Sequence, residues 1–319
     1  MNKKPAILYV VVPCYNEEAI LPETEKQLGS LIRDMIEEKI LSPESRIVFV
    51  DDGSRDKTWE LIADMAERGS LFQGIKLAHN AGHQNALWAG MTKVQDDCDC
   101  LITIDADLQD DICAIRKFMD EYYAGADVVY GVRSKRETDT RFKRMTAEMF
   151  YKGMAKLGVE TVYNHADYRL LSRRAVKELL SFSEVNLFLR GMVPTIGFKS
   201  AKVYYERKER TAGESKYPLK KMLAFAAQGV TSFSIKPIRM IALLGFIFAL
   251  AAVGIGVYAL VSLIIGRAVP GWTSTMLSIW LIGGVQLIAL GLIGEYIGKI
   301  YMEVKHRPRF IVEEYKKRD

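Results

Sequence analysis

The chain has 319 residues, of which 49% are hydrophobic, and its 44 Lys and Arg against 39 Asp and Glu give a formal net charge of +5. This length allows one large or two modest domains, and so mild a charge gives no reason to expect a nucleic-acid partner. The four cysteines form no Cys-x-x-Cys pair, so free cytosolic thiols are expected rather than disulfides (Cys14, Cys98, Cys100, Cys113).

Up to about residue 215, apolar runs alternate with charged stretches, as in a soluble α/β protein. The pattern predicts strands at 6–12, 46–50, 74–78, 100–104 and 127–132, and helices at 21–38, 57–68, 84–94, 112–123 and 141–157. This rhythm favours a mostly parallel sheet with helices on both faces. No signal peptide is expected, because the first apolar run is β-branched and stops at Pro13.

Two carboxylates follow the predicted strand at 100–104. Asp105 and Asp107 are spaced i, i+2, and the amide of Gln109 comes two residues later. Ligands of open α/β sheets bind beyond the carboxyl ends of the strands, so both acids can point into that crevice. Hard oxygen donors at this spacing suit Mg²⁺ or Mn²⁺ shared with substrate phosphates. The alternative is a pair of solvated loop acids.

The ends of two other predicted strands are also polar. Asp51 and Asp52 end the second strand, where Asp52-Gly53 has turn composition and Ser54 or Asp56 can cap the next helix, so a turn plus a cap is the alternative to ligand binding. His79 and His83 follow the third strand, and loop hydrogen bonding is expected of them, since no third nitrogen or sulfur ligand is near.

Residues 133–144 are strongly basic, and the alternative to a binding role is a solvated basic face. Asp167 follows the helix predicted at 141–157, and a helix cap before Arg173 is its alternative. The polar loop at 208–217 contains Arg210 and Lys216.

Two stretches near the C-terminus, 240–266 and 271–294, contain no charged residue over 27 and 24 positions. Each is long enough to cross a bilayer, which takes roughly 20 apolar residues; buried core helices are the alternative. Basic residues flank the pair and only Arg267 lies between them, which predicts cytosolic termini and a cytosolic N-terminal domain. The amphipathic, basic-edged segment 219–233 predicts an interfacial helix. The strand-like tail at 308–315 is expected to pair with a neighbouring molecule.

Taken together, the polar segments 13–18, 51–54 and 105–109, in this order at successive strand ends, resemble those of the family 2 glycosyltransferases of GT-A fold. More narrowly, the chain resembles the polyprenyl-phosphate glycosyltransferases, such as dolichol-phosphate mannose synthases and bactoprenol glucosyltransferases. The two C-terminal spans match the bacterial membrane-anchored subgroup, so the resemblance covers nearly the whole chain. It departs from the family at Asp110-Asp111-Ile112, where a proline is frequent. The Gln-x-x-Arg-Trp motif of processive members is absent, which argues for transfer of one sugar.

The resemblance implies a GT-A catalytic domain (1–215), an interfacial helix (216–235), a two-helix membrane domain (236–298) and a basic cytosolic tail (299–319). Asp107 and Asp167 are expected to act in catalysis, with Asp167 an orienting residue rather than an obligatory base. The implied ligand sites are one for the nucleotide (Pro13, Tyr15, Glu17, Asp51, Asp105), one for Mg²⁺ or Mn²⁺ (Asp105, Asp107, Gln109) and one for the acceptor phosphate (Arg133, Arg141, Arg144, Arg210, Lys216).

The function implied is inverting transfer of one hexose, glucose first, from a UDP-sugar to undecaprenyl phosphate on the cytosolic membrane face, for modification of cell-envelope glycans. A homo-oligomer is expected, as in relatives. A GDP-mannose enzyme is the alternative within the class. A transporter or flippase subunit is the alternative outside it, but two spans without central charges are a poor basis for transport. A nucleotide-binding scaffold without activity is disfavoured by the intact pair of Asp105 and Asp107.

Overall fold

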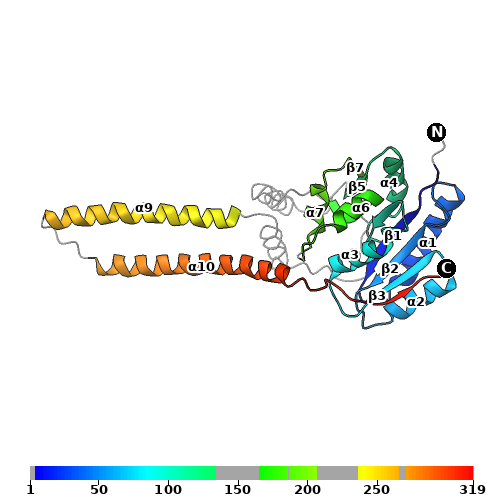
Figure 1. Cartoon of the computed structure of the whole chain (residues 1–319), viewed down its shortest axis with the longest axis horizontal. Coiled ribbons are helices and arrows are strands. Elements are labelled where there is room, and N and C mark those ends of the chain that lie inside the picture. The colour runs from blue at the N-terminus through cyan, green and yellow to red at the C-terminus, as the bar shows by residue number, and fades with distance from the viewer. Residues whose placement is uncertain (1–3, 134–164, 186, 207–235, 266–270, 319) are drawn as a thin grey trace. The chain divides into compact units, whose positions relative to one another are not determined.

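The computed structural model describes residues 4–133, 165–185, 187–206, 236–265 and 271–318. The described residues form two compact units (Figure 1). One contains the N-terminal part of the chain together with the segment from Arg307 onward, and the other contains the two long C-terminal helices. The predictions of a helix at 141–157 and of an interfacial helix at 219–233 lie outside the described residues, and the domain boundaries stay predictions.

The first unit is built on an eight-stranded sheet with the strand order β7-β5-β6-β4-β1-β2-β3-β8. Neighbouring strands are parallel except that β6 runs antiparallel to β4 and β5, and β8 runs antiparallel to β3. This confirms the predicted GT-A-like, mostly parallel α/β fold. The elements are β1 (Leu8–Cys14), α1 (Leu21–Glu37), β2 (Arg46–Asp51), α2 (Thr58–Arg68), β3 (Phe72–Leu77), α3 (His83–Val94), β4 (Cys100–Thr103), α4 (Ala114–Tyr123), β5 (Val128–Arg133), β6 (His165–Ser172), α6 (Arg173–Leu180), α7 (Leu189–Thr195), β7 (Ser200–Tyr205) and β8 (Val312–Lys316).

Both faces of the central strands are covered, so these strands are continuously apolar. Every residue of β1 is buried. Val10 packs in the same core cluster as Ile32 of α1. Val11 points to the opposite face, where α3 approaches so closely that a Cβ on Gly90 would lie 2.4 Å from Val11 Cγ1. The sheet therefore holds its strand ends in fixed positions.

The first strand runs to Cys14, past the predicted stop at Pro13, which pairs with Val50 of β2. Alternate residues of β1 bond to β2 and to β4: Cys14 accepts a hydrogen bond from Asp52 on the β2 side (2.9 Å), and Val11 accepts one from Ile104 on the β4 side (3.2 Å). Pro13 shares the β4 side with Val11, and β4 has already ended there. The missing N–H of proline therefore costs no ladder hydrogen bond.

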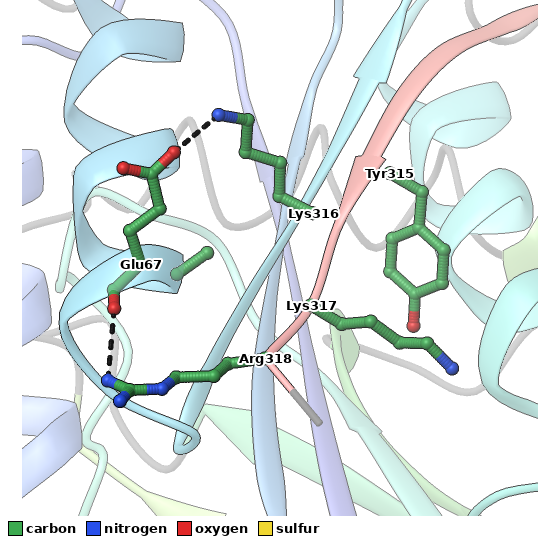
Figure 2. Close-up of a pocket in the computed structure, with 6 residues that line it drawn as sticks. Glu67, Tyr315, Lys316, Lys317 and Arg318 are labelled. Atoms are coloured by element: carbon green, nitrogen blue, oxygen red, sulfur yellow. Dashed lines mark hydrogen bonds and ion pairs between the residues drawn. The ribbon is translucent and has the colours of Figure 1, made fainter.

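The C-terminal tail forms β8, which pairs with β3 of its own chain, from Gly74↔Lys316 to Leu77↔Val312. The segment thus forms a strand within its own chain and occupies the edge of β3, and its pairing with a neighbouring molecule stays a prediction. Side chains add to the ladder: Lys316 Nζ lies 2.6 Å from Glu67 Oε1 and Arg318 donates to the Glu67 carbonyl (3.2 Å), as Figure 2 shows.

The helices of the second unit, among the described residues, are α9 (Lys236–Ile264) and α10 (Trp272–Val304). The segments Lys236–Ile255 and Leu281–Val304 are both long and apolar enough to cross a membrane. Large apolar side chains along both helices, such as Phe246, Leu250, Leu287 and Ile288, are exposed. Such an apolar surface suits contact with lipid. The second helix extends past the predicted end of the membrane domain at residue 298, as far as Val304.

Candidate active site

The polar segments after β1 and β2 interlock at the carboxyl edge of the sheet. Asn16, with a positive φ of 54°, donates its backbone N–H to Ser54 Oγ (2.9 Å), and its side-chain Oδ1 accepts from the N–H of Arg55 (2.9 Å). The N–H of Glu17 donates to Thr58 Oγ1 (2.9 Å). These hydrogen bonds thus join the two segments that the sequence assigned to the nucleotide.

Asp51 is fully buried at the end of β2. Its Oδ1 accepts a hydrogen bond from the N–H of Ser54 (3.2 Å), whereas the buried Oδ2 has no hydrogen-bond partner among the described residues. Burial raises the pKa of this carboxyl group, and the contacts with Ser54 offset part of that effect. A buried acceptor atom without a donor is costly and therefore calls for a ligand as its partner.

Asp52 has a different function, which is to shape the next loop. Its Oδ1 accepts from the N–H of Ala81 (2.7 Å) and its Oδ2 from the N–H of Gly82 (3.0 Å). The adjacent Gly53 has a φ of +67°, and a Cβ there would lie 2.7 Å from the backbone nitrogen of Asn80. For Asp52, the interpretation as a turn residue therefore fits better than ligand binding. Its side chain fixes the loop that leads into α3.

Asp105 and Asp107 follow β4 at the same edge of the sheet. Asp107 Oδ1 accepts from the N–H of Gln109 (3.1 Å), and Leu108 between them has a φ of 52° that turns the chain. Burial raises the pKa of Asp105 to about 6, and the nearby carboxylates act in the same direction. Carboxylates as close together as these favour a bound cation.

The chemistry of these donors fits Mg²⁺ or Mn²⁺, because carboxylate and amide oxygens are hard ligands. Within the described part of the chain, no three His, Cys, Asp or Glu side chains converge closely enough to hold an ion by themselves. Asp105, Asp107 and Gln109 would therefore share the ion with water and substrate phosphate, as Mg²⁺ sites commonly do.

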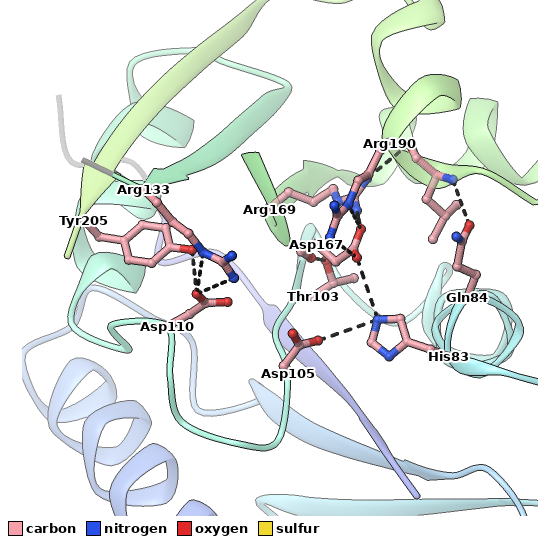
Figure 3. A network of polar contacts seen from close by, with 11 residues as sticks. His83, Gln84, Thr103, Asp105, Asp110, Arg133, Asp167, Arg169, Arg190 and Tyr205 are labelled. Carbon is pink, nitrogen blue, oxygen red and sulfur yellow. Dashed lines mark hydrogen bonds and ion pairs between the residues drawn. The ribbon is translucent and has the colours of Figure 1, made fainter. Parts of the chain in front are cut away.

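His83, the first residue of α3, lies between two carboxylates (Figure 3). Its Nε2 is 3.6 Å from Asp105 Oδ1 and 3.9 Å from Asp167 Oδ2. The sequence predicted only loop hydrogen bonding for this residue. No local pattern could have indicated its position, because the loop is set by Asp52 and the two acids come from β4 and β6.

Asp167 lies within β6, beside β4, where Thr103 Oγ1 donates to its carbonyl. Its carboxylate accepts from Arg169 Nη2 and also from Arg190, whose Nε and Nη2 lie 3.3 and 3.0 Å away. Although burial raises its pKa, the charges of Arg169 and Arg190 hold the pKa of Asp167 well below its usual range. The alternative reading as a helix cap is wrong, since Ser172 caps α6.

Arg133, expected to bind the acceptor phosphate, forms an ion pair with Asp110. Its Nη2 lies 3.1 Å from Asp110 Oδ1, and the same oxygen accepts from the hydroxyl of Tyr205 (2.7 Å). Asp110 belongs to the acidic segment where the family frequently has proline, so this departure supplies the anchor for Arg133. The other predicted phosphate ligands lie outside the described residues (Arg141, Arg144, Arg210, Lys216).

Comparisons with known proteins agree with this geometry. The family described as Glycosyl transferase family 2 matches residues 9–180, and the GtrB C-terminal hairpin matches residues 236–300. A Bacillus subtilis protein described as an uncharacterized glycosyltransferase is 54% identical, over 98% of this chain and 93% of that protein. The prophage bactoprenol glucosyl transferase homolog of Escherichia coli K12 and the bactoprenol glucosyl transferase of Shigella phage SfV are each 39% identical, over 97% of this chain and 99% of theirs. The chain therefore belongs to glycosyltransferase family 2.

Proposed function

We propose that this protein transfers one glucose residue, with inversion, from UDP-glucose to undecaprenyl phosphate at the cytosolic face of the membrane. The observation that carries this proposal is the Asp105–Asp107 pair at the carboxyl end of β4, in a chain that continues into two helices of membrane-spanning length. The bactoprenol glucosyl transferases among the relatives support the choice of sugar and of acceptor.

The nucleotide would bind at the ends of β1 and β2, where Cys14, between Pro13 and Tyr15, pairs with Asp51. Glu17 would complete the site from the segment that bonds to Thr58. Asp51 Oδ2, buried and without a hydrogen-bond partner among the described residues, is suited to accept a hydrogen bond from an N–H group of the base. Asp105, Asp107 and Gln109 would hold the metal. When bound, Mg²⁺ or Mn²⁺ neutralises the charge that develops on the leaving diphosphate.

The acceptor needs little help from a base. The second pKa of a phosphate monoester is near 6, so at neutral pH the attacking oxygen is already ionised. Asp167, held ionised by Arg169 and Arg190, is poorly suited to take up a proton. Positioning and electrostatics are therefore expected to dominate, with Asp167 orienting the groups around it.

The two apolar helices would anchor the enzyme where the phosphate head of the acceptor lies. Basic residues flank them and Arg267 alone lies between them, which supports cytosolic termini and a cytosolic catalytic unit. Such an anchor would keep the acceptor phosphate within reach of the catalytic unit.

The test uses membranes that contain the full chain, radiolabelled UDP-glucose or GDP-mannose, and added undecaprenyl phosphate. We expect label from UDP-glucose in the lipid extract, in a product that releases glucose on mild acid treatment. If only GDP-mannose labels the lipid, the donor is GDP-mannose and not UDP-glucose. If neither donor labels the lipid, the proposed transfer is overturned.

A further inference from the structure

Arg190 enters the proposed function only as a positive charge beside Asp167, and no sequence pattern singles it out. It lies in α7, and its guanidinium reaches the carboxylate of Asp167 through two nitrogens. Figure 3 shows Arg169 and Arg190 converging on this one acid, with His83 between Asp167 and Asp105. The guanidinium of Arg190 therefore belongs to the same cluster as the acid expected to bind the metal.

The two arginines that meet Asp167 differ in how exposed they are. Asp167 carries one negative charge, whereas Arg169 and Arg190 carry two positive charges. Arg169 is the buried partner, with 2% of its side-chain surface exposed, against 15% for Asp167 and 33% for Arg190. Arg190 is therefore the arginine of this pair that an anionic ligand can reach.

Two hydrogen bonds hold the backbone of Leu189, the residue before Arg190. The N–H of Leu189 donates to Gln84 Oε1 (3.0 Å), and the carbonyl of Leu189 accepts from Arg169 Nη1 (3.2 Å). Leu189 itself is buried, as are Met192 and Val193 on the next turn. Side chains from α3 and β6 thus fix the start of α7, and Asp167 fixes the direction of the Arg190 guanidinium.

We propose that Arg190 binds a phosphate oxygen of a substrate, with Asp167 presenting its guanidinium to that oxygen. A planar guanidinium that is pre-oriented by one carboxylate is a suitable donor for a phosphate anion. Two substrates carry such a group, the diphosphate of the nucleotide sugar and the monophosphate of the lipid. This inference rests on the proposed function, which supplies both.

The test measures KM for UDP-glucose and for undecaprenyl phosphate, with the full chain in detergent, for R190A and R190K. The matched control is R174A, because Arg174 also forms a two-nitrogen pair with an acid, Asp127, at the opposite, amino end of β5. R190A should raise KM for one substrate about ten- to a hundred-fold, as expected for a lost charge-assisted hydrogen bond. R190K should recover part of the loss, and R174A should leave both constants unchanged.

The substrate whose KM rises identifies the phosphate that Arg190 binds: the nucleotide sugar indicates the diphosphate, and the lipid indicates the monophosphate. Unchanged KM values in R190A, or equal increases in R190A and R174A, would overturn the inference and leave Arg190 with a structural role only. If the wild-type chain itself transfers no glucose, the proposed function fails instead, so the two failures are distinguishable.

Discussion

The hydroxyl of Tyr315 donates a hydrogen bond of 2.8 Å to Gln73 Oε1, across 242 residues of sequence. This contact joins β8, which follows the second apolar helix, to β3 in the catalytic sheet. The apolar hairpin is therefore an insertion between two parts of one folded unit, rather than an anchor appended to a finished domain.

The first prediction follows from this pairing. A chain that ends at residue 306 lacks β8 and should unfold at a lower temperature than the full chain, because the edge of β3 loses its ladder and its packing. Tyr315→Phe should have a smaller effect, of about 0.5–1.5 kcal/mol for one hydrogen bond. Thermal unfolding of the detergent-solubilised proteins measures both, and equal midpoints for all three chains would contradict this view of the tail.

The same pairing affects how a soluble catalytic domain should be made. A chain ending near residue 215 removes the apolar helices but also removes β8, so loss of activity in it would have two causes. Adding the segment 307–319 as a separate peptide separates these causes, since it can restore the strand and cannot restore the membrane anchor.

The second prediction concerns the metal site. Asp107→Asn should leave the chain folded but lower turnover by orders of magnitude, because one ligand charge is lost. Asp105→Asn should have a similar effect. Asp120→Asn, an exposed acid in α4, is the control and should behave as wild type. Binding of Mn²⁺ in the presence of UDP, followed by calorimetry, should weaken in the site variants only, and normal turnover of Asp107→Asn in saturating Mn²⁺ would refute the assignment.

The third prediction separates binding from stability at Asp51. Burial raises the pKa of this group, so keeping it ionised at neutral pH lowers the stability of the folded chain. Asp51→Asn removes that charge and should leave the unfolding temperature equal or higher, while the dissociation constant for UDP rises about ten-fold or more. Calorimetric titration with UDP and a thermal scan test this together. Undiminished UDP affinity would show that Asp51 does not contact the nucleotide.

Local sequence was enough to predict one half of the site. Asp51 ends one continuous apolar strand, Asp105 and Asp107 come soon after another, and the carboxyl ends of parallel strands meet at one edge. The sheet class and the two apolar helices follow from the same kind of pattern.

The other half depends on pairings between distant segments. β6 escaped prediction because Asp167 and Arg169 interrupt its apolar pattern, and their charges are tolerated because Asp167 pairs with Arg169 and with Arg190. Arg190 meets Asp167 from 23 positions away, and β8 meets β3 from the far end of the chain. Such contacts are set by topology rather than by local composition.

The last prediction tests whether Asp167 orients its neighbours or acts as a base. Because Arg169 and Arg190 hold its folded-state pKa below the unfolded value, Asp167 contributes stability that is present above about pH 4 and is lost as the pH falls below that. The difference in unfolding temperature between wild type and Asp167→Asn should therefore be full at pH 6–8 and shrink toward pH 3.

The activity of Asp167→Asn gives the second, independent readout. An orienting residue should produce a rate loss that is nearly flat above about pH 7, where the acceptor phosphate is already dianionic. A general base would produce a loss that shrinks as the pH rises and the acceptor ionises unaided. Steady-state rates between pH 6 and 9, with both substrates saturating, distinguish the two. A loss that falls steeply with rising pH would assign Asp167 to proton transfer and would contradict the role that its two arginines indicate.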